Sequence, residues 1–451
     1  MTDWSSKNIV SIISTEVNGI TIKNIYKPPV TKWSINVIKV LDNQPTVYIG
    51  DFNSRHKKWG YENNDKNDPF LHTKKFLQIH GFEGPKKYFW HITAVLKSII
   101  MFGRTIYACQ ILNQPKLLAD FIATYPVGLM AIIKMYMLFF DKKRVQYFYD
   151  TVKNEFWDFQ IVDPEVQLQI KKRVFITHIS ILFHLCAPLL ILLFLCVTPI
   201  VDMPEGKRPL TCINWTPFDI EPSPRHEIFY VIMIWNYVLS VIVNVVFDVI
   251  YLYAYQHLCV QIIVLKELLQ NIAKDLMKGN DDCKMFSSED FQNKVYRRLK
   301  ICVAHHVKLL KFGKNLEEFC SVVLLPQLVM SYAALAINGF IISVNHSDDL
   351  VKAFIITSVS FASFVQLALF AISASDLEDQ CLSVMDSIIC SDWYLFKYPL
   401  KRALIIMLMN SKIPISIRAG GLVKIMNPVL IEILQKAFST IVLLRALTGV
   451  E

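Results

Sequence analysis

The sequence has few of the motifs that mark soluble enzymes and metal-binding proteins. It contains 10 cysteines in 451 residues but no C-x-x-C pair, and it has no G-x-S-x-G motif, Walker loop or H-E-x-x-H. His305 and His306 are adjacent, so on a helix their side chains point about 100° apart and cannot share a metal. His178 and His184 lie six residues apart, and we expect both to serve ordinary packing. The chain as a whole is therefore predicted to be no enzyme and to hold no metal or cofactor.

The sequence also lacks a segment in which basic residues gather with interleaved aromatic residues. The formal net charge is +9, from 47 Lys and Arg against 38 Asp and Glu, but the basic residues recur in short polar intervals between apolar runs. That distribution is typical of the cytoplasmic loops of a membrane protein and argues against a nucleic-acid partner. Residues 1–30 lack the pattern of a secretory signal peptide, so we expect membrane entry to use an internal helix.

Long apolar runs dominate the rest of the chain, which is 53% hydrophobic with a mean hydropathy of +0.36. A bilayer core of about 30 Å needs roughly 20 mostly apolar residues per helix. Charges within such a span indicate a face turned to protein or water, and Lys97, Arg104, Glu432, Lys436 and Arg445 interrupt the first and last candidates. The seven candidate spans are residues 88–112, 117–140, 174–201, 228–254, 322–342, 351–373 and 423–447.

The distribution of Lys and Arg sets the predicted orientation of these spans. Basic residues collect before the first span, between the second and third, between the fourth and fifth and before the last, whereas the opposite connections have few. The N-terminus is therefore predicted inside and the C-terminus outside. Two glycosylation sequons, at Asn214 and Asn345, fall in connections that this topology places outside. An internal N-terminus excludes a G-protein-coupled receptor, and Pro428 is expected in the first turn of the last helix.

Residues 258–320 form an interval that is too long for a simple turn. Apolar residues recur three and four apart with Lys and Glu between them, which predicts helices that continue from the fourth span and lead into the fifth. This cytoplasmic bundle would serve either subunit association or packing within one subunit. Asp376, Glu378 and Asp379 follow the sixth span and form either a solvated helix end or a vestibule that attracts cations. The predicted fold class is an all-α polytopic membrane protein with seven transmembrane helices and a cytoplasmic helical anchor.

The C-terminal segment, residues 391–447, carries the most specific pattern in the chain. Trp393 and Tyr394 precede a basic amphipathic stretch, and the turn "NSKIPISIRAGG", ending at Gly421, leads into "LQKAFSTIVLLR". This segment resembles the insect odorant receptor family, and the resemblance extends over residues 70–451. Two alternatives stay open. One is a gustatory receptor-type channel, whose usual Thr-Tyr and Gln-Phe ending is missing here, and the other is a non-channel transporter, which would show internal repeats or broken helices.

The resemblance implies a subunit of an odorant-gated, nonselective cation channel. Four subunits, normally including a shared odorant co-receptor, would surround a central pore in the lipid of the plasma membrane of an olfactory neuron dendrite. A pocket in the outer half of the bundle would hold small volatile odorants mainly by shape and apolar burial, unless the matching residues serve ordinary packing. These residues are Phe121, Tyr125, Leu190, Tyr230, Met233, Phe354, Thr357 and Phe361.

The last helix would line the pore of such a channel. In "FSTIVLLRAL", Ser439 and Thr440 offer hydroxyl groups to hydrated ions. Ile441 or Leu443 would supply an apolar constriction that gates by dewetting. The alternative for Leu443 is that it faces lipid or a neighbouring helix.

A different resemblance marks the start of the chain. The stretch "VYIGDFNSRHKKWGY", which contains Asp51 and Asn53, resembles an internal piece of the endonuclease/exonuclease/phosphatase family found in non-LTR retrotransposons. The upstream metal-binding Glu and the downstream Ser-Asp-His motif of that family are missing, and a single Asp does not organise metal-assisted hydrolysis. We therefore expect residues 1–69 to be a β-rich, non-functional fragment that does not fold alone, and residues 70–451 to be the receptor domain. The junction would arise from a gene-prediction error or from a real insertion.

Overall fold

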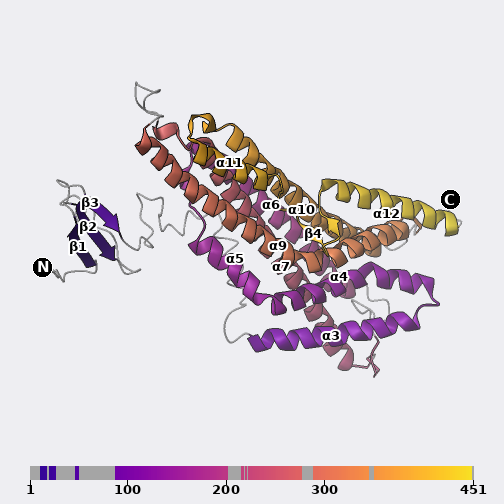
Figure 1. Cartoon of the computed structure of the whole chain (residues 1–451). Coiled ribbons are helices and arrows are strands. Elements are labelled where there is room, and N and C mark those ends of the chain that lie inside the picture. Colours follow the sequence, from indigo (N-terminus) through magenta and orange to yellow (C-terminus); the bar gives the residue numbers. More distant parts are fainter. Residues whose placement is uncertain are drawn as a thin grey trace.

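The computed structural model describes residues 11–17, 20–26, 46–49, 87–201, 215–217, 219–220, 222–276, 288–344 and 350–448. From residue 87 onward the described chain is almost entirely helical (Figure 1). The sequon residues Asn214 and Asn345 lie outside the described residues, as do Asp51 and Asn53.

Nine α-helices make up the described part of the chain after residue 86. They are α3 (Lys87–Gln110), α4 (Pro115–Phe140), α5 (Lys142–Asn154), α6 (Pro164–Val201), α7 (Arg225–Gln270), α9 (Glu289–Val344), α10 (Leu350–Ile389), α11 (Tyr398–Ser411) and α12 (Asn427–Thr448). Short 3-10 turns at Phe159–Ile161, Lys274–Leu276 and Trp393–Leu395 connect some of them. The seven apolar runs fall on α3, α4, α6, α7, α9, α10 and α12.

Several helices extend well beyond the length of a bilayer span. The helix α7 has 46 residues and α9 has 56, so the predicted helical continuations of the fourth and fifth spans are confirmed. The sixth run does not end near residue 373, because α10 continues to Ile389. The acidic residues expected at a helix end therefore lie within a helix.

The last helix begins at Asn427 and not at the predicted residue 423. Val423–Lys424 form strand β5, which pairs antiparallel with strand β4, Arg418–Ala419. Pro428 falls in the first turn of α12, as predicted. Gly420 and Gly421 have positive φ angles of 59° and 71°, a region that favours glycine, and this allows the reversal between the two strands.

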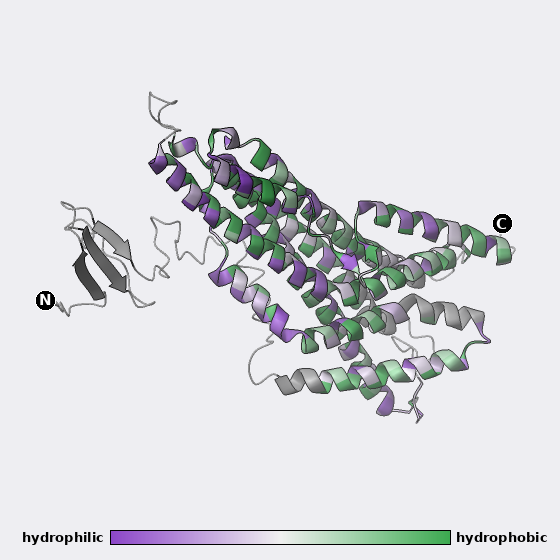
Figure 2. Cartoon of the chain, viewed as in Figure 1, coloured by the Kyte–Doolittle hydropathy of each residue, from purple (hydrophilic) through white to green (hydrophobic). Residues whose placement is uncertain are grey.

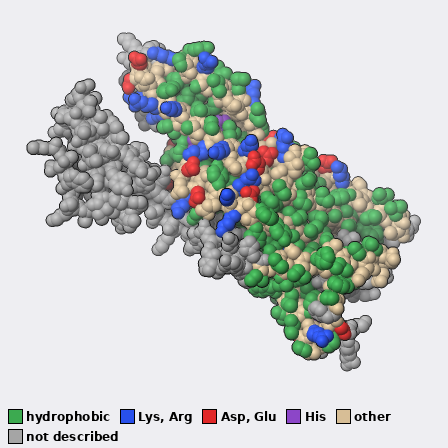
Figure 3. All heavy atoms as spheres, turned by 60° about the horizontal axis from the view of Figure 1, so that its bottom comes forward, with side chains coloured by type: hydrophobic (Ala, Val, Ile, Leu, Met, Phe, Trp, Pro, Cys, Tyr) green, Lys and Arg blue, Asp and Glu red, His purple; other side chains and the backbone are tan. Residues whose placement is uncertain are grey.

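Among the described residues, five helical segments are long and apolar enough to cross a membrane. These segments belong to α3, α6, α7, α9 and α10, and Tyr125–Phe140 of α4 is a shorter apolar helix. Hydrophilic residues are frequent on α5 and where α9 begins (Figure 2). Hydrophobic side chains cover much of the surface over the half that holds α3 and α12, whereas charged side chains gather over the other half (Figure 3). This division of the surface is what a bilayer around one half requires.

The core lies where α7, α9 and α10 pack together, with α4, α6 and α12 around them. Phe247 and Phe319 stack with ring centroids 5.1 Å apart, and Tyr251 and Phe370 lie 4.8 Å apart. The turn before α12 is tied to α9, because Gly420 N donates to Ser321 O at 2.8 Å. The last helix is thereby attached to the same core.

The start of the chain holds a small three-stranded sheet. Strand β1 (Ser11–Val17) pairs antiparallel with β2 (Ile20–Tyr26), and β2 pairs parallel with β3 (Thr46–Ile49). The expected boundary near residue 69 lies outside the described residues, so the division into two domains stays a prediction.

Candidate functional site

A cavity of about 200 Å³ lies between α3, α4, α6, α7, α9 and α10. Most of its wall is apolar, which suits a small molecule with a large apolar surface. The apolar lining includes Met101, Pro126, Met130, Pro188, Leu192, Met233, Ile234, Met330 and Val359. The polar lining includes Arg104, His184, Asn236, Ser240, Asn244, Gln327, Ser331, Ser363 and Gln366.

The residues expected to bind an odorant take three different positions around this cavity. Met233 lines the cavity directly. Phe121 and Tyr125 do not line it but lie beside the lining residue Arg104, whose guanidinium carbon is 5.2 Å and 5.8 Å from the two ring centroids. Tyr125 also exchanges a hydrogen bond of 2.9 Å with Thr105.

The other expected odorant-binding residues do not line the described wall of the cavity. Tyr230 is half-buried elsewhere on α7. Leu190, Phe354 and Phe361 are 49%, 40% and 47% exposed, and Thr357 is exposed with its hydroxyl bonded to Ala353 O. The structure thus brings three of the eight residues to the cavity or next to it, and their role in binding stays a prediction.

A buried ion pair contacts two residues of the cavity lining, His184 and Gln366. Lys134 Nζ of α4 is 2.7 Å from Asp248 Oδ1 of α7, and the two side chains are 0% and 4% exposed. His184 Nε2 of α6 is 3.0 Å from Asp248 Oδ2. A buried carboxylate must be both paired and hydrogen-bonded to offset the cost of its desolvation. This site therefore fixes α4, α6 and α7 to one another.

Two glutamine side chains extend this network to the remaining helices. Gln366 of α10 donates to Asp248 Oδ2, and its own Oε1 accepts from Gln327 Nε2 of α9 at 2.9 Å. Gln327 Nε2 also donates to Ser331 Oγ at 3.0 Å. Because His184, Gln327, Ser331 and Gln366 all line the cavity, the network forms its polar floor.

Sequence reasoning missed this polar floor. Lys134 and Asp248 each stand inside an apolar run, and an ionisable residue within a span is a signal of function or pairing. Lys97 and Arg104 are also charges within a predicted span, and they are 1% and 6% exposed. Lys97 donates to Ser240 of α7. The expectation that these two charges face protein or water is confirmed.

The predicted pore residues of α12 divide between two faces of the helix. Thr440 Oγ1 lies 2.8 Å from Tyr332 Oη of α9. Ile441 packs against Gly339 of α9 so closely that a Cβ on this glycine would lie 2.5 Å from Ile441 Cδ1. Ser439 and Leu443 are exposed. Two of the four residues therefore contact α9, and two point away from the bundle.

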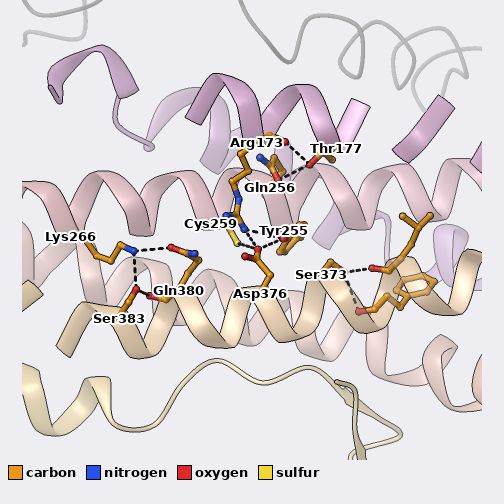
Figure 4. Close-up of polar contacts among 12 residues, drawn as sticks. Arg173, Thr177, Tyr255, Gln256, Cys259, Lys266, Ser373, Asp376, Gln380 and Ser383 are labelled. Carbon is orange, nitrogen blue, oxygen red and sulfur yellow. Dashed lines mark hydrogen bonds and ion pairs between the residues drawn. The ribbon is translucent and has the colours of Figure 1, made fainter. Parts of the chain in front are cut away.

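A second polar cluster joins α6, α7 and α10 (Figure 4). Arg173 and Tyr255 both contact Asp376, and Cys259 Sγ is 3.8 Å from its Oδ2. Glu378 pairs with Lys424 at 2.6 Å. Two of the three acidic residues are thus paired within the chain, an arrangement that neither a solvated helix end nor a vestibule anticipated. Among the described residues, no group of three or more His, Cys, Asp or Glu is placed to hold a metal ion.

Comparisons with known proteins connect this arrangement to one family. A family model described as "7tm Odorant receptor" matches residues 119–438. The odorant receptor Or2 of Anopheles gambiae is 21% identical over 227 residues, which cover 50% of this chain. The chain spans only 58% of the length of that curated relative.

Solved structures share the fold of this chain. The insect olfactory receptor OR5 from Machilis hrabei matches with a TM-score of 0.71 and 12% identity, over 84% of this chain and 99% of that one. The structure of the same receptor in complex with eugenol matches with a TM-score of 0.67 and 14% identity, over 84% and 100% of the two chains. Because the family model matches more than half of its residues, the chain belongs to the 7tm odorant receptor family, as a multi-pass membrane receptor and not an enzyme.

Proposed function

We propose that the chain is an odorant-binding subunit of a ligand-gated, nonselective cation channel. The observation that carries this proposal is the largely apolar cavity lined by residues of six helices. A solved relative, the olfactory receptor OR5, has been seen in complex with eugenol. Burial of apolar surface, at about 25 cal/mol per Å², would supply most of the binding free energy for a volatile molecule. Met233 would contact the ligand, while Phe121 and Tyr125 would hold Arg104 at the wall.

The last helix is proposed to line the pore of an assembly of four subunits that includes an odorant co-receptor. The exposed face of α12 carries the ion pair of Glu432 and Lys436 beside apolar residues, and charges within a span indicate a face turned to protein or water, which supports an interface or pore there. Its exposed apolar residues are Ile431, Leu434, Phe438, Val442, Leu443 and Leu447. Leu443 with Ser439 would face the ion path, whereas Thr440 and Ile441 would hold α12 against α9.

The remaining expectations complete this proposal. Seven spans would place the N-terminus inside and the C-terminus outside, in the plasma membrane of an olfactory neuron dendrite. Asn214 and Asn345 would then be glycosylated on the outer side. Leu190, Tyr230, Phe354, Thr357 and Phe361 would shape the surroundings of the ligand without lining the described cavity.

Whole-cell recording tests the proposal directly. Cells that express this chain with an insect odorant co-receptor would be exposed to a panel of volatile esters, alcohols, terpenes and aldehydes. We expect a cation current whose odorant profile is absent from cells that express the co-receptor alone. No current from any odorant, with delivery to the cell surface verified, would contradict the proposal. Gating requires only that the ligand bind the open state more tightly than the closed one.

A further inference from the structure

Three buried hydrogen-bond acceptors belong to side chains that line the cavity. They are Gln327 Oε1, Asn236 Oδ1 and His184 Nδ1, and no described residue donates a hydrogen bond to any of them. A buried polar atom without a partner loses its hydration without compensation. A group of such atoms in the side chains around one cavity therefore favours an occupant that brings a donor.

The orientation of the Gln327 amide follows from the charge on Asp248. A carboxylate only accepts hydrogen bonds, so Gln366 turns its Nε2 to Asp248 and presents its Oε1 to Gln327. Gln327 must then donate from Nε2, which also donates to Ser331 Oγ at 3.0 Å. A flipped Gln327 would set two carbonyl oxygens against each other. Its Oε1 is thus held as an acceptor in a side chain that is only 4% exposed.

The carboxylate of Asp248 also determines which ring nitrogen of His184 accepts a hydrogen bond. The ring Nε2 lies 3.0 Å from Asp248 Oδ2 and donates to it, so in the tautomer that this contact selects Nδ1 is the acceptor nitrogen. An ammonium ligand would also satisfy acceptors, but the guanidinium cation of Arg104 lines the same cavity. Repulsion between two cations in a poorly solvated site favours a neutral donor over a charged one.

We infer that the cavity selects neutral hydroxyl compounds, alcohols or phenols, whose O–H donates to Gln327 Oε1. The apolar body of the ligand packs against Met101, Leu192 and Met233. This inference deepens the proposed function and rests on it only in taking the cavity as the ligand site. An ether of equal size leaves Gln327 Oε1 unsatisfied, because an ether oxygen has no hydrogen to donate.

Isomeric pairs of ligands test this selectivity on the full-length chain purified in detergent. The probes are 1-octanol with heptyl methyl ether, and 4-propylphenol with 4-ethylanisole, since each pair has one composition and a similar shape. Dissociation constants come from quenching of intrinsic tryptophan fluorescence. We expect the hydroxyl isomer to bind at least about fivefold more tightly, the usual effect of one hydrogen bond. Equal affinities within both pairs would overturn the inference.

The variant Gln327→Met removes the acceptor while keeping a side chain of similar length. The ratio of ether to alcohol dissociation constants is expected to fall to near one in this variant. The matched control is Ser363→Ala, since Ser363 lines the cavity but donates to Val359 O of its own helix at 2.9 Å; the ratio should persist there. A ratio that persists in Gln327→Met would overturn the inference. Binding is measured on the purified chain and needs no ion current. A chain that binds ligand but conducts no current would therefore contradict the proposed function and leave the measured selectivity unchanged.

Discussion

At the scale of single residues, the Lys134–Asp248 pair carries the largest electrostatic consequence. Both side chains are nearly inaccessible, and Nζ and Oδ1 are 2.7 Å apart. Removing one partner of a buried pair costs about 3–5 kcal/mol, because the other charge is left uncompensated, whereas replacing both is often tolerated. We expect Lys134→Met to lower the thermal unfolding temperature of the detergent-purified chain. The double variant Lys134→Met/Asp248→Asn should recover much of that loss, a non-additive result.

An exposed ion pair provides the control for this residue-scale prediction. Lys294 and Asp290 lie 2.6 Å apart on the first turns of α9, with side chains 54% and 76% exposed. Surface pairs of this kind contribute about 0–1 kcal/mol, so Lys294→Met should leave the unfolding temperature nearly unchanged. One contrary result is that the losses in unfolding temperature of the single variants Lys134→Met and Asp248→Asn simply add up in the double variant, and another is that Lys294→Met loses as much as Lys134→Met. Either result would show that the buried pair has no special role.

At the scale of helices and strands, the apolar runs predicted where helices occur but not how each one is rotated. A run that is apolar on all faces has no periodic stripe to identify its buried side. The expected odorant-binding residues accordingly take different positions: Met233 lines the cavity, whereas Leu190 and Phe354 are exposed. The short pairing of Val423–Lys424 with Arg418–Ala419 depends on contacts between segments, which local sequence does not encode. The polar floor was missed because its members are far apart in sequence.

The contact between α9 and the turn after α11 yields a second prediction at this scale. A Cβ on Gly313 would lie 2.5 Å from Ile415 Cδ1 and 2.7 Å from its Cγ2. Ala is favoured over Gly by about 1 kcal/mol inside an exposed helix, but here the steric overlap should reverse the sign. We expect Gly313→Ala to lower the unfolding temperature. In an Ile415→Ala background, which removes the overlapping atoms, the same substitution should be neutral or stabilising; a loss of equal size in both backgrounds would contradict this explanation.

At the scale of the whole molecule, the N-terminal sheet and the helical bundle differ in how much core they can form. The three described strands have 7, 7 and 4 residues, whereas the core cluster runs through the helices from Ala94 to Ile425. We predict that a sheet of this size, which offers little apolar surface to bury, does not fold alone. The first 69 residues are therefore expected to contribute nothing to odorant responses.

This expectation predicts the behaviour of a shortened chain. A chain that begins at Phe70 behind a new initiator methionine should reach the cell surface and give the same odorant-evoked current as the full chain when each is expressed with the co-receptor. The matched control is the full chain carrying Asp51→Ala and Asn53→Ala, which should also respond normally, because the endonuclease-like motif has no role in gating. A lost current in the shortened chain, with surface delivery verified, would mean that residues 1–69 support the receptor. A lost current in the control alone would assign a function to the motif itself.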